Sequence, residues 1–328
     1  MSSAVPAGPA GQRGQPPSPV EAPVLMEEEA EGFTAVQHAP ASSPYQDGHY
    51  PGAPVYPGVF LIETAFRAAC LYLESRGGGR LCLAEVSRAR FSAPGFPGDS
   101  FTVQAGTRQL SASCWEVRAQ CLRSRDGQRL ADLVLRLRRA EAADEEDGES
   151  ATAASGTAAG TGTGRTRTTA EVPVGREAAG DWDTHSLIPH RGEMLLLSEV
   201  LGIEAGRTVR ATHRVSTDEP CFRGACLTDT PCPAPWPRTL MTEFIGQAAV
   251  LLCSYSSGRG ADGPPPLFTR ARGVRFLGDA FPGDTVTAEV EADHIGSPAA
   301  LLRARAWVGD RLVCEIDQAM IVYSDIGG

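Results

Sequence analysis

Apolar residues recur at the spacing of a helix in two stretches of this chain. In residues 59–74 they lie three or four positions apart, the pattern of a helix with one buried face. These positions are Ile62, Phe66, Ala69 and Leu73. Residues 240–255 are similarly apolar, and Pro57 and Pro237 stand just before the two stretches, where a fixed φ and a missing N–H do no harm. The pattern predicts two long helices, 59–74 and 240–255.

Polar and apolar residues alternate in the segments around these helices, as in strands with one buried face. A β-rich entry precedes each helix, and strands joined by short turns follow it. The turns are Arg-Asp-Gly-Gln at 125–128 and Gly-Asp at 309–310, both typical of hairpins. The expected strands are 33–38, 115–122, 129–137, 208–215, 301–308 and 312–322. One helix with an antiparallel sheet, present twice, predicts an α+β fold.

The two halves of the chain also repeat each other in sequence. Phe-Pro-Gly-Asp occurs at 96–99 and again at 281–284, an offset of 185 residues. Glu63 corresponds to Glu243 at an offset of 180, so small insertions in the second half account for the difference. Such a repeat indicates two related structural units in one chain.

Two segments carry too little apolar side chain to offset the entropy of ordering them. Residues 1–30 are rich in proline, alanine, glycine and serine, and we expect a disordered tail. Residues 141–180 join an acidic run to an Ala, Thr and Gly tract, which is typical of a flexible linker. The folded blocks are then 31–140 and 181–328.

Composition excludes several classes of function. The 328 residues include 30 basic and 40 acidic side chains, for a net charge of −10, whereas nucleic-acid binding needs clustered cations in surplus. No apolar run approaches the ~20 residues that span a bilayer, and no secretory signal is visible at the start. Nine cysteines without paired spacing predict reduced thiols in a cytoplasmic protein. A zinc site of Cys221, Cys226 and Cys232 lacks a histidine at ligand spacing, so no metal is expected.

The loop before the first helix carries the candidate chemistry. His49 is followed by a stretch dense in proline and glycine, which fixes the backbone in one shape. Gly58 falls at the helix N-terminus, where free N–H groups and the helix dipole favour developing negative charge. A histidine held there is a candidate base beside an oxyanion site. The alternative is a loop histidine that makes hydrogen bonds and has no chemical role.

This loop resembles a known enzyme family. Gly-His-Tyr-Pro-Gly at 48–52, Val-Tyr-Pro-Gly-Val at 55–59 and Glu63 are similar to the bacterial 3-hydroxyacyl-[acyl-carrier-protein] dehydratases of fatty-acid synthesis. The second half resembles the same family in Leu-Ile-Pro-His-Arg at 187–191 and in its helix around Glu243. The resemblance implies two hotdog folds, each a helix wrapped by a curved antiparallel sheet, fused here as a pseudo-dimer. A further homodimer is left open.

The second half departs from the family pattern where the first half keeps it. Ala225 stands where the family has its histidine, and Arg238 stands at the counterpart of Gly58. The first half departs elsewhere. It has Arg67 at the counterpart of Gln247, and it lacks the Pro-His-Arg segment.

The family builds each active site across a dimer interface, with histidine and carboxylate from different subunits. Carried over to this chain, the resemblance pairs His49 and Gly58 with Glu243 and Gln247. It leaves Ala225, Arg238, Glu63 and Arg67 at the other location. The resemblance therefore implies one complete composite site and one ruined site, in which Glu63 is a relic.

Roles follow from the family reaction, the dehydration of a 3-hydroxyacyl thioester to a trans-2-enoyl thioester. Neutral His49 takes the α-proton. The Gly58 amide polarises the thioester carbonyl. Glu243, expected to be protonated because burial raises a carboxyl pKa, donates to the leaving hydroxyl. Gln247, one turn along the helix, orients that carboxyl.

No cofactor is expected, because the substrate is carried on the phosphopantetheine of acyl carrier protein, the expected partner. An acidic carrier surface is expected to dock on arginines. The candidates are Arg88, Arg90, Arg270 and Arg272. The segment His190-Arg191 is expected to cap or pack over the fold. The remaining histidines are expected to be structural or solvated: His38, His185, His213 and His294.

Two other functions remain open from the sequence. The hotdog fold also hosts thioesterases, so release of a free acid is an alternative to water loss. The loss of half the site residues also allows a non-catalytic partner subunit of a separate dehydratase. The sequence leaves open the acyl chain length, the choice between fatty-acid and polyketide synthesis, and isomerisation of the 2-enoyl product.

Overall fold

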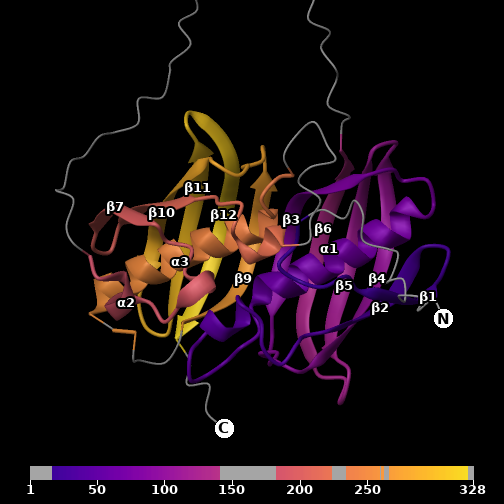
Figure 1. The fold of residues 1–328 in the computed structure, drawn as a ribbon, viewed down its shortest axis with the longest axis horizontal. Coiled ribbons are helices and arrows are strands. Elements are labelled where there is room, and N and C mark those ends of the chain that lie inside the picture. The colour runs from indigo at the N-terminus through magenta and orange to yellow at the C-terminus, as the bar shows by residue number, and fades with distance from the viewer. Residues whose placement is uncertain (1–16, 141–181, 224–233, 259, 262–265, 324–328) are drawn as a thin grey trace, which may run out of the picture.

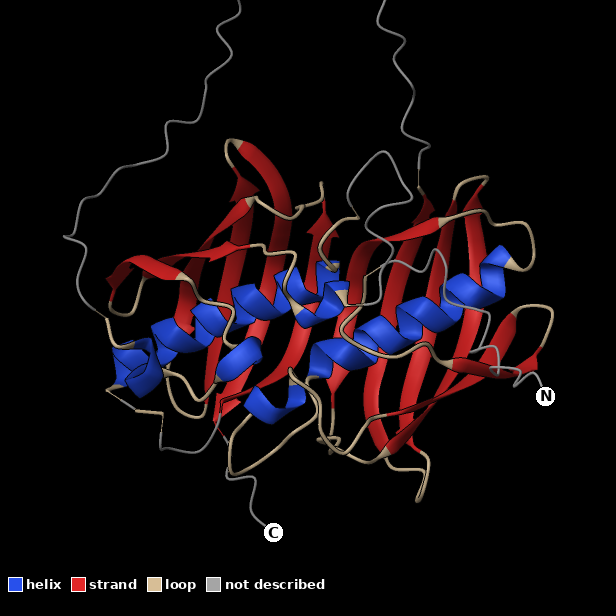
Figure 2. Cartoon of the chain, in the orientation of Figure 1, coloured by secondary structure: helices blue, strands red, loops and turns tan. Residues whose placement is uncertain are grey.

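The computed structural model describes residues 17–140, 182–223, 234–258, 260–261 and 266–323. Within these residues two long helices, α1 (Gly58–Glu74) and α3 (Arg238–Ser257), lie against the same face of one antiparallel sheet, as Figure 1 and Figure 2 show. Both helices were predicted, and each begins one or two residues earlier than expected. The α+β prediction is thus confirmed.

Twelve strands make up the sheet among the described residues, six from each half of the chain. Those of the first half are β1 (Val24–Glu28), β2 (Gly32–His38), β3 (Leu81–Phe91), β4 (Ser100–Ser111), β5 (Cys114–Arg123) and β6 (Arg129–Arg139). Those of the second half are β7 (Glu199–Glu204), β8 (Thr208–Arg214), β9 (Pro266–Phe276), β10 (Thr285–Ile295), β11 (Ala299–Val308) and β12 (Arg311–Tyr323). Short helices complete the set: η1 (Gln46–Gly48), α2 (Thr184–Leu187), η2 (Gly192–Met194) and η3 (Pro220–Phe222).

The strand order is β1-β2-β4-β5-β6-β3-β9-β12-β11-β10-β8-β7, so β3 and β9 join the halves at the centre. The register of β3 and β9 is symmetric, because a pair of residues across it has an equivalent pair in which the two halves exchange places. Glu85 lies opposite Arg275 and Arg90 lies opposite Arg270. The sequence offset of 185 residues relates Arg90 to Arg275 and Glu85 to Arg270. The pair Arg90–Arg270 therefore corresponds to the pair Arg275–Glu85. We call this junction of β3 and β9 the seam.

The repeated Phe-Pro-Gly-Asp turns have the same structure in both halves. The Asp99 carboxylate accepts a hydrogen bond from the Phe96 N–H at 3.0 Å, and Asp284 accepts one from Phe281 at 2.9 Å. Both turn glycines have positive φ, a conformation that glycine adopts without steric cost. The sequence repeat is thus also a repeat of local structure.

The halves share one hydrophobic core. Buried residues from α1 and α3 belong to a single cluster that also takes in the inner faces of both sets of strands. Each helix packs on the strands of its own half, and the two helices also contact each other. The N-terminal turns of the two helices meet near the junction of the halves, where the Thr239 hydroxyl of α3 donates to Glu63 of α1. The N-terminal end of each helix therefore lies near the helix of the other half.

The expected tail of residues 1–30 is wrong in its second part. Residues 24–28 form β1, which pairs with β2, and the Ser18 N–H donates to the Cys221 carbonyl oxygen at 3.2 Å. Pairing with β2 satisfies backbone hydrogen-bonding groups of β1 and so stabilises this segment. A prediction of disorder from amino-acid composition does not take that pairing into account. Residues 1–16 and the expected linker at 141–180 lie outside the described residues.

Several smaller expectations have an outcome in the structure. Among the described residues no helix is long and apolar enough to cross a membrane. Cys226 and Cys232, from the rejected zinc site, lie outside the described residues, and Cys221 is a buried free thiol. His213 is structural, as expected. It is buried, and its ring nitrogens contact the Leu196 carbonyl oxygen at 2.7 Å and Glu219 at 3.2 Å.

Candidate active site

His49 lies at the junction of the two halves, in the loop between η1 and α1. Its side chain is only 6% exposed, and its ring stacks on Tyr50 with centroids 4.2 Å apart. The Tyr50 hydroxyl donates to the Pro266 carbonyl oxygen of the other half at 3.2 Å. The Arg191 N–H donates to the Gly48 carbonyl oxygen at 3.1 Å. The histidine loop of the first half is thus fastened to two segments of the second.

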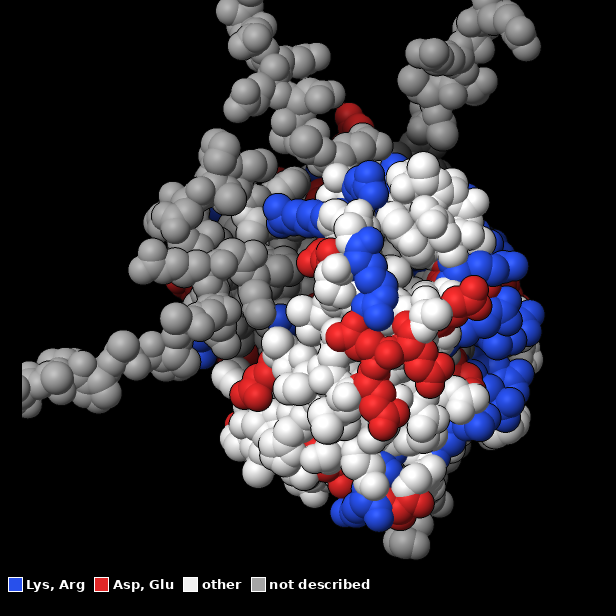
Figure 3. All heavy atoms as spheres, turned by 90° about the vertical axis from the view of Figure 1, so that its right-hand side faces the viewer, with Lys and Arg blue, Asp and Glu red and all other residues white. Residues whose placement is uncertain are grey.

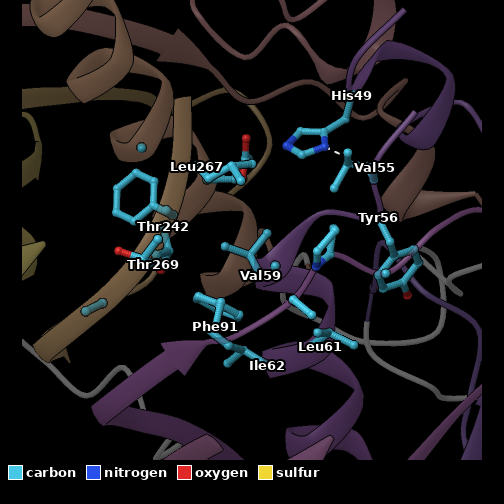
Figure 4. Close-up of a pocket in the computed structure, with 18 of the residues that line it drawn as sticks. His49, Val55, Tyr56, Val59, Leu61, Ile62, Phe91, Thr242, Leu267 and Thr269 are labelled. Atoms are coloured by element: carbon cyan, nitrogen blue, oxygen red, sulfur yellow. Dashed lines mark hydrogen bonds between the residues drawn. The ribbon is translucent and has the colours of Figure 1, made fainter. Parts of the chain in front are cut away.

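The tautomer of His49 follows from its hydrogen bond. Its Nδ1 lies 2.8 Å from the Val55 carbonyl oxygen, which can only accept, so Nδ1 carries the hydrogen. In the neutral ring the other nitrogen, Nε2, then holds a free lone pair. Figure 4 shows the bond to Val55 on one side of the ring and the second nitrogen directed away from it. This geometry suits a proton acceptor.

Glu243 comes from the second turn of α3, on the other half of the chain. Its Oε1 lies 3.5 Å from His190 Nε2, and the Gln247 amide donates to the same oxygen at 3.1 Å. Gln247 is itself fixed, because it donates to the Met194 carbonyl oxygen at 2.7 Å and accepts from the Leu196 N–H at 2.9 Å. The carboxylate is therefore held in one orientation, as the sequence predicted for Gln247.

The three acid–base side chains converge. The ligating atoms of His49, His190 and Glu243 all lie within 4.8 Å of one another. A divalent ion could be held by two imidazoles and one carboxylate at this spacing. An ion bound there would occupy the Nε2 lone pair that a proton transfer needs, so the cluster suits either a metal or acid–base chemistry, and the comparisons below favour the second.

Burial and neighbouring charges set the protonation of this cluster. Burial lowers the pKa of His49 to about 4, despite the opposing charge of Glu243, so the imidazole is neutral near pH 7. Burial raises the pKa of Glu243, but the His190 hydrogen bond and the His49 charge lower it more, and the net pKa is below its ordinary value. The expected protonated Glu243 is therefore wrong for the free protein, because burial is not the only influence on its pKa.

A cavity of about 870 Å³ opens beside the cluster. His49 and Glu243 both line it, together with the N-terminal end of α1, the second to fourth turns of α3, and the ends of β3 and β9 that meet where the halves join. Figure 4 shows His49, Val59 and Phe91 around this cavity. The apolar lining includes Val59, Leu61, Ile62, Phe91, Leu267 and Phe268. Its volume and lining suit an extended apolar chain with one reactive polar end.

Gly58 is the first residue of α1 and lines the same cavity. As a first-turn residue its N–H has no acceptor within the helix, and the helix dipole adds positive potential. A Cβ at this position would stand 3.1 Å from the Phe91 ring, so glycine keeps the backbone accessible between helix and ring. A first-turn residue whose N–H has no acceptor within the helix therefore stands at the wall of the cavity.

At the corresponding place in the second half, the helix begins at Arg238. Its guanidinium pairs with Asp279 at 2.7 Å, donates to the Leu83 carbonyl oxygen at 2.7 Å, and lies 5.7 Å from the centre of the Phe276 ring. Phe276 corresponds to Phe91 at the 185-residue offset. The arginine side chain therefore fills the space that Gly58 leaves open in the other half.

Glu63 lies in this second location, beside the start of α3. Its carboxylate accepts from the Thr239 hydroxyl at 2.8 Å and from the Ser18 hydroxyl at 3.1 Å. Burial raises the pKa of Glu63, and the charge of Arg67 opposes that shift. The predicted partner Ala225 lies outside the described residues. Among those described, Glu63 has hydroxyl partners where Glu243 has imidazoles.

The sequence reasoning missed two features of the site. His190 was expected to pack over the fold, yet it is 2% exposed and contacts Glu243 directly. The first half was expected to lack this segment, yet Pro17-Ser18 precedes β1 as Pro189-His190 precedes β7, and Ser18 contacts Glu63. The sequence did contain a sign that Ser18 and His190 are equivalent, because each follows a proline shortly before the first strand of its half.

Comparisons with known proteins agree with this site. Residues 26–126 match the family described as ApeI dehydratase, and residues 188–317 match the family described as FabA-like domain. The 3-hydroxyacyl-[acyl-carrier-protein] dehydratase FabZ of Variovorax paradoxus (strain S110) is 35% identical over 130 residues, which are 39% of this chain and 84% of the relative. FabZ of Actinobacillus pleuropneumoniae serotype 5b (strain L20) is 31% identical over 131 residues, 40% of this chain and 82% of the relative.

Solved structures resemble the whole chain. The dehydratase domain of PpsC from Mycobacterium tuberculosis, in complex with C12:1-CoA, covers 92% of this chain and 97% of that one, with a TM-score of 0.57 and 13% identity. The dehydratase-cyclase domain in ambruticin biosynthesis covers 93% and 95%, with a TM-score of 0.53 and 15% identity. A putative thioesterase from Novosphingobium aromaticivorans DSM 12444 covers 93% and 100%, with a TM-score of 0.54 and 13% identity. These likenesses show the fold alone.

The fold is the hotdog fold of the dehydratases, built from antiparallel strands with few helices. By its sequence, the chain belongs to the 3-hydroxyacyl-[acyl-carrier-protein] dehydratase family. The reaction of this family is the dehydration of 3-hydroxyacyl thioesters in fatty-acid or polyketide synthesis, and the chain is an enzyme of this class.

The close contact between the histidine loop and the second half predicts that residue 48 must be glycine. A Cβ there would run into the Arg191 carbonyl oxygen and stand 2.8 Å from the Met194 Cβ. Gly48→Ala should therefore lower the free energy of unfolding by roughly 1–3 kcal/mol, the usual cost of overpacking, as measured by urea denaturation.

Gly202→Ala is the matched control, because nothing lies within 4 Å of a Cβ at Gly202. Equal stability of the two variants would contradict the close packing of loop and segment.

Proposed function

We propose that the chain is a double hotdog whose halves form a pseudo-dimer with one composite active site. His49 and the Gly58 amide come from the first half, and Glu243 and Gln247 come from the second. The observation that carries this proposal is the convergence of His49 and Glu243, from different halves, within 4.8 Å beside an apolar cavity. The reciprocal register of β3 and β9 supports the pseudo-dimer.

In this proposal the substrate is a 3-hydroxyacyl thioester carried on the phosphopantetheine of acyl carrier protein. Its apolar chain lies along the cavity wall, and its carbonyl oxygen accepts from the Gly58 N–H. That hydrogen bond strengthens as negative charge develops on the oxygen, because the donor is already in place and little water competes for it. The protein's own groups suffice for the proton transfers, and no cofactor is needed.

The proton transfers form a closed cycle. His49 Nε2 takes the α-proton, and the electron pair of the Cα–H bond becomes the new double bond as the C–O bond breaks. The resulting imidazolium is stabilised by the nearby Glu243 carboxylate, which then relays the proton to the departing hydroxyl. Water leaves, and both side chains return to their resting states. An ionised Glu243 at rest is consistent with this relay, whereas a preloaded acid is not.

His190 acts in this scheme as a positioning residue. Its Nε2 lies 3.5 Å from the Glu243 oxygen that also accepts from Gln247, and its ring lies 5.3 Å from that of His49. The contacts of Glu63 with Ser18 and Thr239 support its role as a relic, because no imidazole of the described residues is recorded beside it.

Two alternatives predict other products. A thioesterase would release a free acid, and the fold likeness to a putative thioesterase is compatible with that outcome. A non-catalytic partner subunit would show no turnover alone. The composite site favours dehydration over both, since it holds a base, a carboxylate and an amide donor together. Mass spectrometry of a 3-hydroxyacyl carrier protein, before and after incubation, separates them by loss of one water.

The composite pairing predicts which carboxylate matters. His49→Ala and Glu243→Gln should each lower kcat for water loss by about 10²–10⁴-fold, because each removes one end of the proton relay. Glu63→Gln should stay near the wild-type rate, since Glu63 accepts hydrogen bonds from the Ser18 and Thr239 hydroxyls and lies outside the His49–His190–Glu243 cluster.

Stopped assays of enoyl thioester formation measure all three variants. A dead Glu63→Gln beside an active Glu243→Gln would reverse the assignment of the two sites.

The pKa of His49 predicts the acid limb of the rate profile. The base must be unprotonated, so kcat/KM should hold steady from pH 7 to about pH 5 and fall as the pH drops through about 4. An unperturbed histidine would instead lose activity near ~6.5. The measurement is initial rate against pH, with circular dichroism at each pH as the control for folding.

The free energy of unfolding should also decrease as the pH is lowered. Between pH ~6.5 and about 4 the unfolded chain binds a proton at His49 that the folded chain does not, so the free energy of unfolding falls as the pH falls.

For the rate profile, a rate that already halves near pH 6.5 in a folded enzyme would rule out the buried neutral base.

A further inference from the structure

Four exposed arginines meet on the outer face of the sheet where its two halves join. Arg88 and Arg90 of β3 lie directly opposite Arg272 and Arg270 of β9. The intervening Ala89 and Ala271 are buried, and adjacent strand residues point to opposite faces, so the arginines point to solvent. We refer to Arg88, Arg90, Arg270 and Arg272 as the seam arginines.

Like charges directly opposite each other in a sheet are unfavourable, and several other arginines of this sheet are compensated by acidic residues. Arg136 pairs with Glu85 at 2.9 Å, Arg118 with Glu116 at 2.9 Å, and Arg305 with Glu315 at 3.1 Å. Among the described residues, the seam arginines make no ion pair. Figure 3 shows, on the edge of the first half, arginine side chains crowded along one side of the molecule with acidic side chains nearby.

The acidic residue nearest in register does not neutralise the seam arginines. Asp132 of β6 lies opposite Arg90 on its other side, but its ion pair is with Arg129 at 3.4 Å. The other cross-strand neighbours are uncharged: Val134 opposite Arg88, Met320 opposite Arg270 and Gln318 opposite Arg272. The positive charge of the cluster is therefore available to an external partner.

The two ends of the seam differ in whether their arginines are paired with acidic residues. At the 185-residue offset, the pair Arg90–Arg270 corresponds to the pair Arg275–Glu85. There Arg275 binds Asp317 at 2.6 Å, and Glu85 binds Arg136. Positive charge is thus left uncompensated at the end of the seam that belongs to the composite site and is neutralised at the relic end.

This end of the seam also borders the cavity. Phe91 follows Arg90, Thr269 precedes Arg270, and both line the cavity. Ser92 and Gln128 line it as well and are exposed, so the cavity reaches the surface close to Arg90. A carrier bound over the seam arginines could therefore pass its prosthetic arm around the end of β3 into the site.

We propose that the seam arginines are the docking surface for the acidic face of the carrier protein that delivers the acyl chain. The proposal rests on the dehydratase function proposed above. With a net charge of −10 the enzyme repels an acidic partner as a whole, so a local cluster without counter-charges decides where such a partner binds.

The test uses the double variant Arg90→Ala/Arg270→Ala and two substrates with the same acyl group, one on carrier protein and one on free pantetheine. With the carrier substrate we expect KM to rise by on the order of tenfold and its dependence on salt to weaken. With the pantetheine thioester, kcat and KM should match wild type. The thermal midpoint should stay the same or rise, because a repulsion has been removed.

Arg303→Ala/Arg305→Ala is the matched control, since both arginines are exposed on the same sheet but paired with acidic residues. It should leave both substrates unaffected. Equal losses for the two substrates, or no loss for either, would overturn the docking surface. If wild type dehydrates neither substrate, the failure belongs to the proposed function and not to the docking surface.

Discussion

Antiparallel pairing of β3 with β9 is the interaction on which the rest of this structure depends. It joins two six-stranded sheets into one and brings the N-terminal turns of α1 and α3 together over a shared core. Backbone hydrogen bonds fix the register, and a slip of one residue would turn every side chain of one strand to the other face. The position of His49 beside Glu243 is a consequence, since each residue is carried by a different half.

In the pseudo-dimer that we propose, the same seam accounts for two unequal sites. Once two halves are fused, each site draws its histidine loop from one half and its carboxylate helix from the other, so the copies can diverge separately. Arg238 fills the space that Gly58 leaves open, and Ser18 stands where His190 would be. At the second location Glu63 is buried and accepts hydrogen bonds from the Ser18 and Thr239 hydroxyls, whereas among the described residues imidazoles lie beside Glu243.

Protonation in the working site is a collective property. Burial pushes His49 toward its neutral form and pushes Glu243 toward its protonated form, yet the pKa of Glu243 falls because two imidazoles and an amide surround it. A carboxylate that is ionised at rest stabilises an imidazolium formed during the reaction, and this favours a relay of one proton over a preloaded acid. The seam arginines show a similar dependence on neighbours, because the strand register places them opposite one another and none of them is ion-paired with a described acidic residue.

The sequence by itself determined the elements whose cause is local. Helical spacing placed α1 and α3 to within two residues, and turn sequences placed the hairpins. The family resemblance proposed the pairing of His49 with Glu243. Only the tertiary structure decided the order of residues 17–28, the contact of His190 with Glu243, and the net pKa of that carboxyl. The physical reason is that periodicity reports which face of an element is buried, whereas edge pairing, pKa and charge compensation depend on groups far away in the chain.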